Sequence, residues 1–166
     1  MKKSDVDYLY EWATKTDFPL RRAPTAVGYS NKDIHFCWLK AIYRNGAIGG
    51  VRKSVVEDER AQQILDQEEV IFATVSVFDA GTKLNPHRDP PVYGKKYRRV
   101  QIPLYIPSDK CYMVWKGKKV FWKEGEPQVY DVMDHIHEGY NLSDDIMMFL
   151  FVDIEKRDDN SNLQEV

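Results

Sequence analysis

The sequence predicts a mainly β protein, a β-sandwich or jelly roll whose sheet is supported by helices near the N-terminus. From residue 70 onward, six short segments are rich in β-branched and aromatic residues, and polar turn residues separate them. Before residue 70, the spacing of apolar residues and a helix start signal indicate one or two short helices. Helices followed by a run of short strands are typical of these folds.

The two predicted helices are placed by different signals. Apolar residues at helical spacing predict a short amphipathic helix over residues 5–16. A capping box at residues 54–57 predicts a second helix that runs to about Gln67. Ile64 and Leu65 would be its inward-facing residues.

Residues 17–50 are rich in Pro, Gly and Asn, and their structure is not predicted, although residues 34–43 are apolar. The predicted strands span residues 70–78, 99–106, 111–115, 119–122, 128–132 and 146–154. Turns are expected at Lys116-Gly117 and Gly125-Glu126, because glycine accepts the backbone conformations that tight turns need.

Length and composition predict one globular domain over residues 1–155, with its β core at about 70–154 and a polar tail at 156–166. The net charge of −2 predicts no nucleic-acid partner and no anionic-membrane partner. No apolar run is long enough to span a bilayer, and no signal peptide is evident, so we expect a cytoplasmic protein. Cys37 and Cys111 are expected to be buried free thiols. The sequence does not predict an oligomeric state.

The triplet His87-Arg88-Asp89, with the distant His137, is the strongest chemical signal in the chain. Residues i and i+2 of a strand point to the same face, so His87 and Asp89 can grip one metal ion together. A second histidine would complete a 2-His-1-carboxylate triad, which leaves one side of an octahedral metal open. This arrangement is typical of non-haem Fe(II) oxygenases. The alternative is a strand-end pair that makes only local hydrogen bonds, because such triplets arise by chance.

A wider set of motifs surrounds the triplet. In chain order these are Gly81-Thr82-Lys83-Leu84-Asn85-Pro86-His87, Arg99, Ile106-Pro107, Trp122-Lys123-Glu124-Gly125, Tyr130-Asp131, His137-Glu138, Asn141 and Phe151-Val152-Asp153. Together they resemble the aspartyl/asparaginyl β-hydroxylase family over roughly residues 70–154. The resemblance implies a double-stranded β-helix (jelly roll, cupin-like) core that uses Fe(II), 2-oxoglutarate and dioxygen. It also implies hydroxylation of the β-carbon of Asp or Asn in a small-molecule or peptide substrate.

The resemblance implies roles for individual residues. His87, Asp89 and His137 would be the metal ligands and the catalytic residues. Part of the family lacks a ligand where this chain has Asp89, so the triad is complete here. His135 is a rival to His137, because residues two positions apart on a strand share a face. The position of His137 before Glu138 favours it, and His135 would pack beside the site.

The cosubstrate residues are less regular. Arg99 matches the family arginine near the metal-chelating carboxylate of the oxoacid, although it also belongs to a basic cluster that could simply be solvated. Ser76 falls where the family has a serine near the distal carboxylate, and Gln101 stands where the family has a histidine. Met147 replaces the arginine that pairs with that carboxylate, and methionine cannot neutralise a buried charge.

Three explanations of Met147 stay open. A basic residue from elsewhere, namely Arg98 or one of the lysines at 95–96, takes over; the cosubstrate is a different oxoacid; or oxygenase activity is lost. A jelly-roll metal-binding module without oxoacid-dependent catalysis is therefore the alternative function, and a purely structural domain is a third. Substrate contacts are expected in the loop at residues 90–97 and in the N-terminal third.

Overall fold

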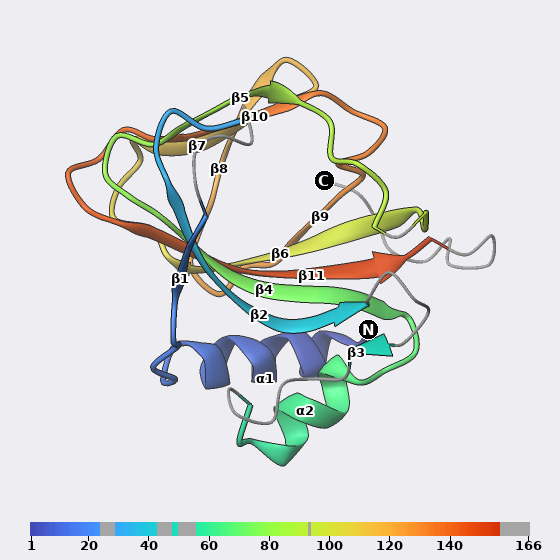
Figure 1. Cartoon of the computed structure of the whole chain (residues 1–166). Helices are drawn as coiled ribbons and strands as arrows, with labels where there is room; N and C mark the ends of the chain where they lie inside the picture. The colour runs from blue at the N-terminus through green and yellow to red at the C-terminus, as the bar shows by residue number, and fades with distance from the viewer. Residues whose placement is uncertain (24–28, 43–47, 50–55, 93, 157–166) are drawn as a thin grey trace.

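The computed structural model describes residues 1–23, 29–42, 48–49, 56–92 and 94–156. They form two antiparallel sheets, one above the other, and two short helices below the larger sheet (Figure 1). The helices are α1 (Lys3–Ala13) and α2 (Glu59–Leu65). The strands are β1 (Arg21–Ala23), β2 (Ile34–Ile42), β3 (Ile48–Gly49), β4 (Val70–Phe78), β5 (Lys83–His87), β6 (Tyr97–Tyr105), β7 (Cys111–Trp115), β8 (Lys118–Phe121), β9 (Gln128–Tyr130), β10 (His137–Asn141) and β11 (Met147–Glu155).

The larger sheet has the order β1-β2-β4-β11-β6-β9, with β3 paired to β2, and the smaller has the order β5-β10-β7-β8. Strands that are neighbours in the sheet are often distant in sequence, as in a jelly roll. The mainly β prediction is confirmed. Neither described helix has the length and hydrophobicity needed to cross a membrane.

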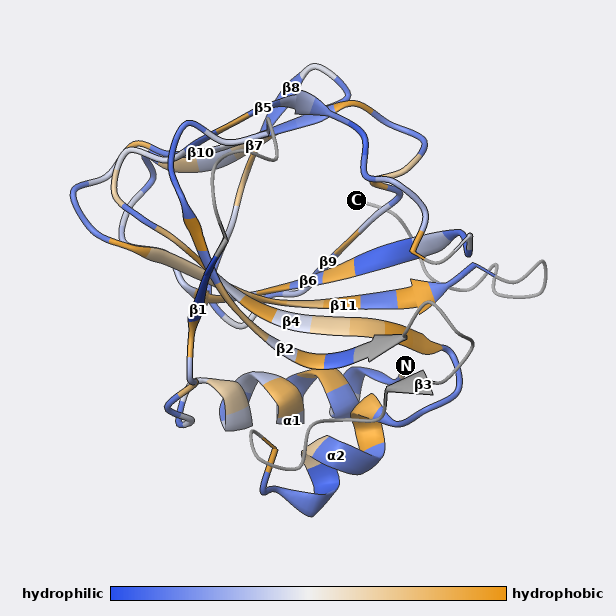
Figure 2. Cartoon of the chain, viewed as in Figure 1, coloured by the Kyte–Doolittle hydropathy of each residue, from blue (hydrophilic) through white to orange (hydrophobic). Residues whose placement is uncertain are grey.

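The central strand β11 is buried on both faces. Leu150 and Val152 belong to the core that also contains Leu9 of α1 and Leu65 of α2. Phe149, on the alternate face, belongs to a second core between the two sheets. This explains why β11 reads as a nearly continuous apolar run, and hydropathy colouring shows a largely apolar β4 beside it (Figure 2). Each fully buried aliphatic side chain contributes about 1.5–3 kcal/mol.

Both predicted helices are present, but α2 begins later than predicted. The capping box at residues 54–57 lies partly outside the described residues, and Val56 to Asp58 are not helical. Asp58 is the N-cap instead, since its carboxylate accepts a hydrogen bond of 2.7 Å from the Ala61 N–H. The inward direction of Ile64 and Leu65 is confirmed.

Strands β4 and β7 have the predicted bounds, and the other four predicted strands are shifted or shortened by two residues or fewer at either end. Positive φ angles at Lys116, Gly117 and Gly125 confirm the two turns. Cys37 and Cys111 are buried and are not joined in a disulfide, as predicted. Strands β5 and β10, which carry the two candidate histidines, were not among the six predicted strands. The predicted tail lies outside the described residues beyond Lys156.

Candidate metal centre

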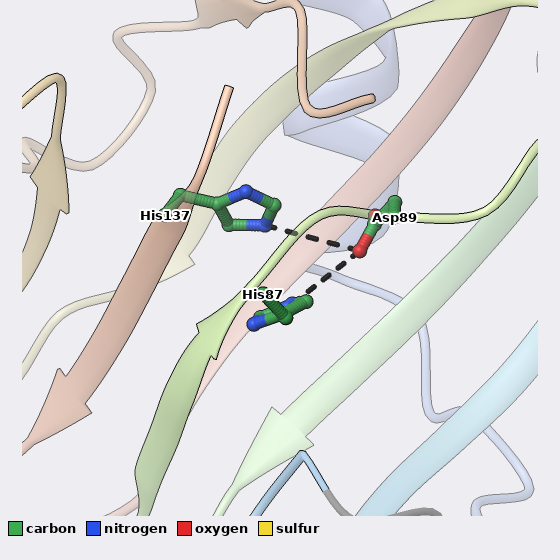
Figure 3. Close-up of side chains that lie close together, drawn as sticks. All are labelled: His87, Asp89 and His137. Atoms are coloured by element: carbon green, nitrogen blue, oxygen red, sulfur yellow. Dashed lines mark ion pairs between the residues drawn. The ribbon is translucent and has the colours of Figure 1, made fainter. Parts of the chain in front are cut away.

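A β-bulge brings the two histidines together. In the pairing of β10 with β5, His137 lies opposite His87, and Gly139 lies opposite Leu84. Strand β5 therefore carries one extra residue between these pairs, where Pro86 has no N–H to donate to the ladder. The two imidazole rings face each other with centroids 4.3 Å apart (Figure 3).

Asp89 follows β5 and turns back toward these rings. Its backbone N–H donates to the Val132 carbonyl at 3.0 Å, which anchors the chain beyond the strand. Its Oδ1 atom lies 3.3 Å from Nε2 of His87 and 3.8 Å from Nε2 of His137 (Figure 3). One ligand atom of each residue lies within 4.8 Å of the others. The structure thus brings together the three residues that the sequence predicts as metal ligands.

Backbone carbonyls orient both imidazoles. Nδ1 of His87 lies 2.6 Å from the Asn85 carbonyl oxygen, and Nδ1 of His137 lies 3.2 Å from that of His135. A carbonyl only accepts hydrogen bonds, so each Nδ1 carries the proton and donates. Each Nε2 lone pair is left to face the centre, which is the arrangement that metal-binding histidines need.

Buried charges hold Asp89 from behind. Its Oδ2 atom accepts a hydrogen bond of 2.6 Å from Nη1 of Arg99. Nε and Nη2 of Arg99 donate to the two oxygens of Asp153 at 2.8 and 2.9 Å. Burial raises the pKa of Asp89, but the charge of Arg99 offsets this and brings it well below its usual value. Asp89 is therefore an anionic ligand whose second oxygen is fixed.

Arg99 is not a solvated member of the basic cluster. Its side chain is 18% exposed, and the two carboxylates surround its guanidinium. Burial by itself would lower its pKa, but Asp153 and Asp89 raise it well above the usual value, so Arg99 stays charged. Its place beside Asp89 is compatible with the predicted contact to an oxoacid carboxylate, because a guanidinium has five N–H donors.

The other two histidines lie outside the cluster. His135 packs edge-on against Trp115, with ring centroids 5.3 Å apart. His35 on β2 lies 3.4 Å from a carboxylate oxygen of Asp79. Of the two rival histidines, His137 is therefore the one that faces Asp89.

The donor set fits a divalent transition metal. Two neutral imidazole nitrogens and one carboxylate oxygen suit Fe(II), and they also suit other divalent ions such as Mn(II). His87 and His137 also line a cavity of about 270 Å³ between the sheets, so the metal would have a protected space beside it. Ser76, Gln101, Arg99 and Met147 line the same cavity. The fold thus gathers all the predicted cosubstrate residues in one place.

Sequence reasoning gave Asp153 a place in the motif but no role. It is fully buried and is the bidentate partner of Arg99. Its signal is visible in β11, where it shares a face with Phe149 and Phe151. A carboxylate in such an apolar alternation needs a buried cation.

A model of the family described as aspartyl/asparaginyl beta-hydroxylase matches residues 43–157, more than half of the chain. The chain belongs to this family. The resemblance to this family that the motifs around His87 and His137 indicate is therefore confirmed. A search of curated proteins finds no match.

Solved structures of low sequence identity share the fold of this chain. An oxidoreductase of the 2OG-Fe(II) oxygenase family from Burkholderia pseudomallei is 12% identical with a TM-score of 0.57, over 91% of this chain and 77% of that one. A predicted oxalate decarboxylase from Thermotoga maritima is 14% identical with a TM-score of 0.54, over 84% and 95%. A cupin-2 domain from Rhodospirillum rubrum is 8% identical with a TM-score of 0.53, over 87% and 76%. These likenesses confirm the cupin-like jelly roll and no more.

Proposed function

We propose that the protein is a non-haem iron dioxygenase that hydroxylates an unactivated C–H bond, with His87, Asp89 and His137 as its metal ligands. The convergence of two Nε2 atoms and one carboxylate oxygen at the edge of a cavity supports this best. Membership of the β-hydroxylase family supports the reaction class. Bound Fe(II) would supply the activation of dioxygen, and an oxoacid would supply two of the electrons that its reduction needs.

The chain's own residues would bind the metal, orient its carboxylate ligand and exclude water from the site. Asp89 would offset one of the two charges of the metal, and the Arg99–Asp153 pair would fix the direction of its carboxylate. Trp122 and Phe149, which line the cavity, would keep bulk water away from the reacting groups.

The proposed substrate is an amino acid or a peptide, hydroxylated at the β-carbon of an Asp or Asn residue as the family implies. Asp89 and Arg99 also line a second cavity of about 420 Å³. Pro90 and Pro91 line it together with Trp38, which is 41% exposed. An amphipathic aromatic side chain beside the metal ligands is suited to contact a substrate, and the loop predicted for this role contributes to the wall.

The metal centre is tested by comparing His87→Ala with His135→Ala. His135 is two residues from His137 but outside the cluster, so its replacement is a matched control. Iron content after anaerobic loading with Fe(II) should fall strongly in His87→Ala and stay near one ion per chain in His135→Ala. Equal iron binding by both variants would contradict the proposal.

A metal-binding module without oxoacid-dependent catalysis is the second candidate. The apolar lining of the cavity and the engagement of Arg99 by two carboxylates favour it. Oxygen consumption by the iron-loaded protein in the presence of an oxoacid separates the two functions. Consumption that depends on the oxoacid and is lost in His87→Ala supports the dioxygenase, and iron binding with no consumption supports the module.

A further inference from the structure

The cavity beside the candidate metal centre becomes less polar with depth. Its floor is formed by the inward faces of β4, β11 and β6, where residues opposite one another make successive rows. Going inward from the rim beside Asp89, these rows are Arg99–Asp153, Gln101–Phe151–Thr74, Phe149–Ser76 and Met147–Phe78. Charge is thus found at the rim, amide and hydroxyl groups in the middle, and only apolar side chains at the far end.

The far end of the cavity has no positive charge in the part of the chain that the structure describes. Arg99 is the only arginine among the described lining residues, and no lysine lines the cavity. The guanidinium of Arg99 is already hydrogen-bonded to two carboxylates, those of Asp153 and Asp89, at the rim. Glu138, which accepts a hydrogen bond from Tyr140, adds a further negative charge to the lining.

The basic residues just before and at the start of β6 do not line the cavity. Lys95 pairs with Glu155 at 2.9 Å. Arg98 precedes Arg99 in β6, so its side chain leaves the opposite face of the strand. Neither residue, nor Lys96, is part of the cavity wall.

A dicarboxylic oxoacid does not fit this distribution of charge. If one carboxylate of 2-oxoglutarate lies at the metal, the other extends into the cavity toward Met147 and Phe78. There it would lose its hydration and meet no cation, and an unpaired buried carboxylate is strongly disfavoured. Burial of an apolar group in the same place is favourable.

We propose that the cavity binds a monocarboxylic 2-oxo acid with an apolar tail, and that the protein uses this acid in place of 2-oxoglutarate. The inference rests on the proposed dioxygenase function. The carboxylate and keto oxygens would lie at the metal beside Arg99, and the tail would point toward Met147. A volume of about 270 Å³ suits a small molecule, since it is below the range of about 300–1,000 Å³ that is usual for larger ligands.

The reaction balances with this acid as the two-electron reductant. The oxoacid loses carbon dioxide and becomes a carboxylic acid one carbon shorter, taking up one atom of dioxygen. The other oxygen atom enters the C–H bond of the substrate as a hydroxyl group. The second carboxylate of 2-oxoglutarate takes no part in this balance, so an apolar tail can replace it without changing the chemistry.

Two oxoacids of similar length test the proposal. We would compare 4-methyl-2-oxopentanoate with 2-oxoglutarate, because they share the 2-oxo acid group and differ at the end that enters the cavity. Dissociation constants are measured anaerobically from tryptophan fluorescence, since Trp122 lines the cavity, with and without loaded Fe(II). The apolar acid is expected to bind at least tenfold more tightly. Equal or tighter binding of 2-oxoglutarate overturns the proposal, and so does binding of neither acid in either form of the protein.

A single substitution at the apolar end is expected to raise the affinity for 2-oxoglutarate. Met147→Arg places a cation at the apolar end, so 2-oxoglutarate should bind at least tenfold more tightly than it binds the parent protein. Met147→Leu is the matched control and should keep the parent order of affinities. If Met147→Arg does not fold, as judged by circular dichroism, the comparison of the two acids on the parent protein still decides.

Failure of the proposed function gives a different result from failure of this inference. Iron content is measured on each sample before the titration. Protein that binds no iron contradicts the dioxygenase, while the order of affinities in the metal-free protein still tests the cavity. Protein that binds iron and prefers 2-oxoglutarate overturns the inference alone.

Discussion

Replacing Asp153 with alanine is expected to destabilise the protein strongly. The Asp153 side chain is fully buried and accepts hydrogen bonds of 2.8 and 2.9 Å from Arg99. Without it, Asp89 is the one charged partner left to this buried guanidinium among the described residues. Removing one member of a buried ion pair costs about 3–5 kcal/mol. For a domain of this size each kcal/mol lowers Tm by about 2–4 °C, so we expect a fall of about 6–20 °C in thermal unfolding.

A double variant separates stability from metal binding. In Arg99→Met with Asp153→Leu, both charges of this pair are gone, so part of the free energy of unfolding lost in Asp153→Ala should be recovered, although Asp89 loses its arginine partner. Asp89 still lacks the donor that fixes its second oxygen, so we expect metal affinity to stay about 10–100-fold lower. Chelator competition with Co(II) measures that affinity.

The control for these variants is Lys95→Ala, which removes a partly exposed ion pair with Glu155. Glu155 lies at the end of β11, the strand that carries Asp153. Its cost should not exceed about 1 kcal/mol. The reasoning is refuted if Asp153→Ala costs no more than Lys95→Ala in urea unfolding. It is also refuted if the double variant binds Co(II) as tightly as the parent protein.

Three further predictions concern stability and are checked by urea or thermal unfolding. Leu150→Ala should cost about 2–5 kcal/mol, because Leu150 is fully buried between the larger sheet and the helices; a cost below 1 kcal/mol would contradict this packing. Asp58→Ala should cost about 0.5–2 kcal/mol through loss of the α2 cap. The Ala61 N–H and the Tyr8 hydroxyl lower the pKa of Asp58, so the difference between Asp58→Ala and the parent protein should be complete above about pH 4 and shrink as the pH falls through the lowered pKa. Gly125→Ala should cost more than Gly117→Ala. Both glycines have positive φ, but only at Gly125 would a Cβ come within 3.1 Å of the Tyr10 ring.

The sequence determined the local features of this protein. The apolar runs of β4 and β7 gave their bounds, because strands buried in a core need β-branched and aromatic residues. Helical spacing placed α1, and glycine marked the turn after β7. The spacing of His87 and Asp89 gave two of the candidate ligands, since residues two apart in an extended chain share a face.

The tertiary structure decided what depends on partners distant in sequence. Strands β5 and β10 are short and rich in polar residues, so only the pairing of β5 with β10 and of β10 with β7 identifies them. The start of α2 depends on Asp58, whose carboxylate also accepts a hydrogen bond from Tyr8 of α1. Such contacts leave no periodic signal in the sequence.

The candidate site shows the same division. Residue types, spacing and the family resemblance predicted the three ligands and favoured His137 over His135, but only the pairing of β10 with β5 places His137 opposite His87. The carboxylate of Asp153 beside Arg99 and the loss of polarity toward Met147 are visible only when β4, β11 and β6 lie side by side. The sequence by itself therefore determined which groups can bind a metal, because ligand chemistry belongs to individual side chains. The tertiary structure alone decided what surrounds the metal, because burial and charge pairing depend on strands that meet across the sheets.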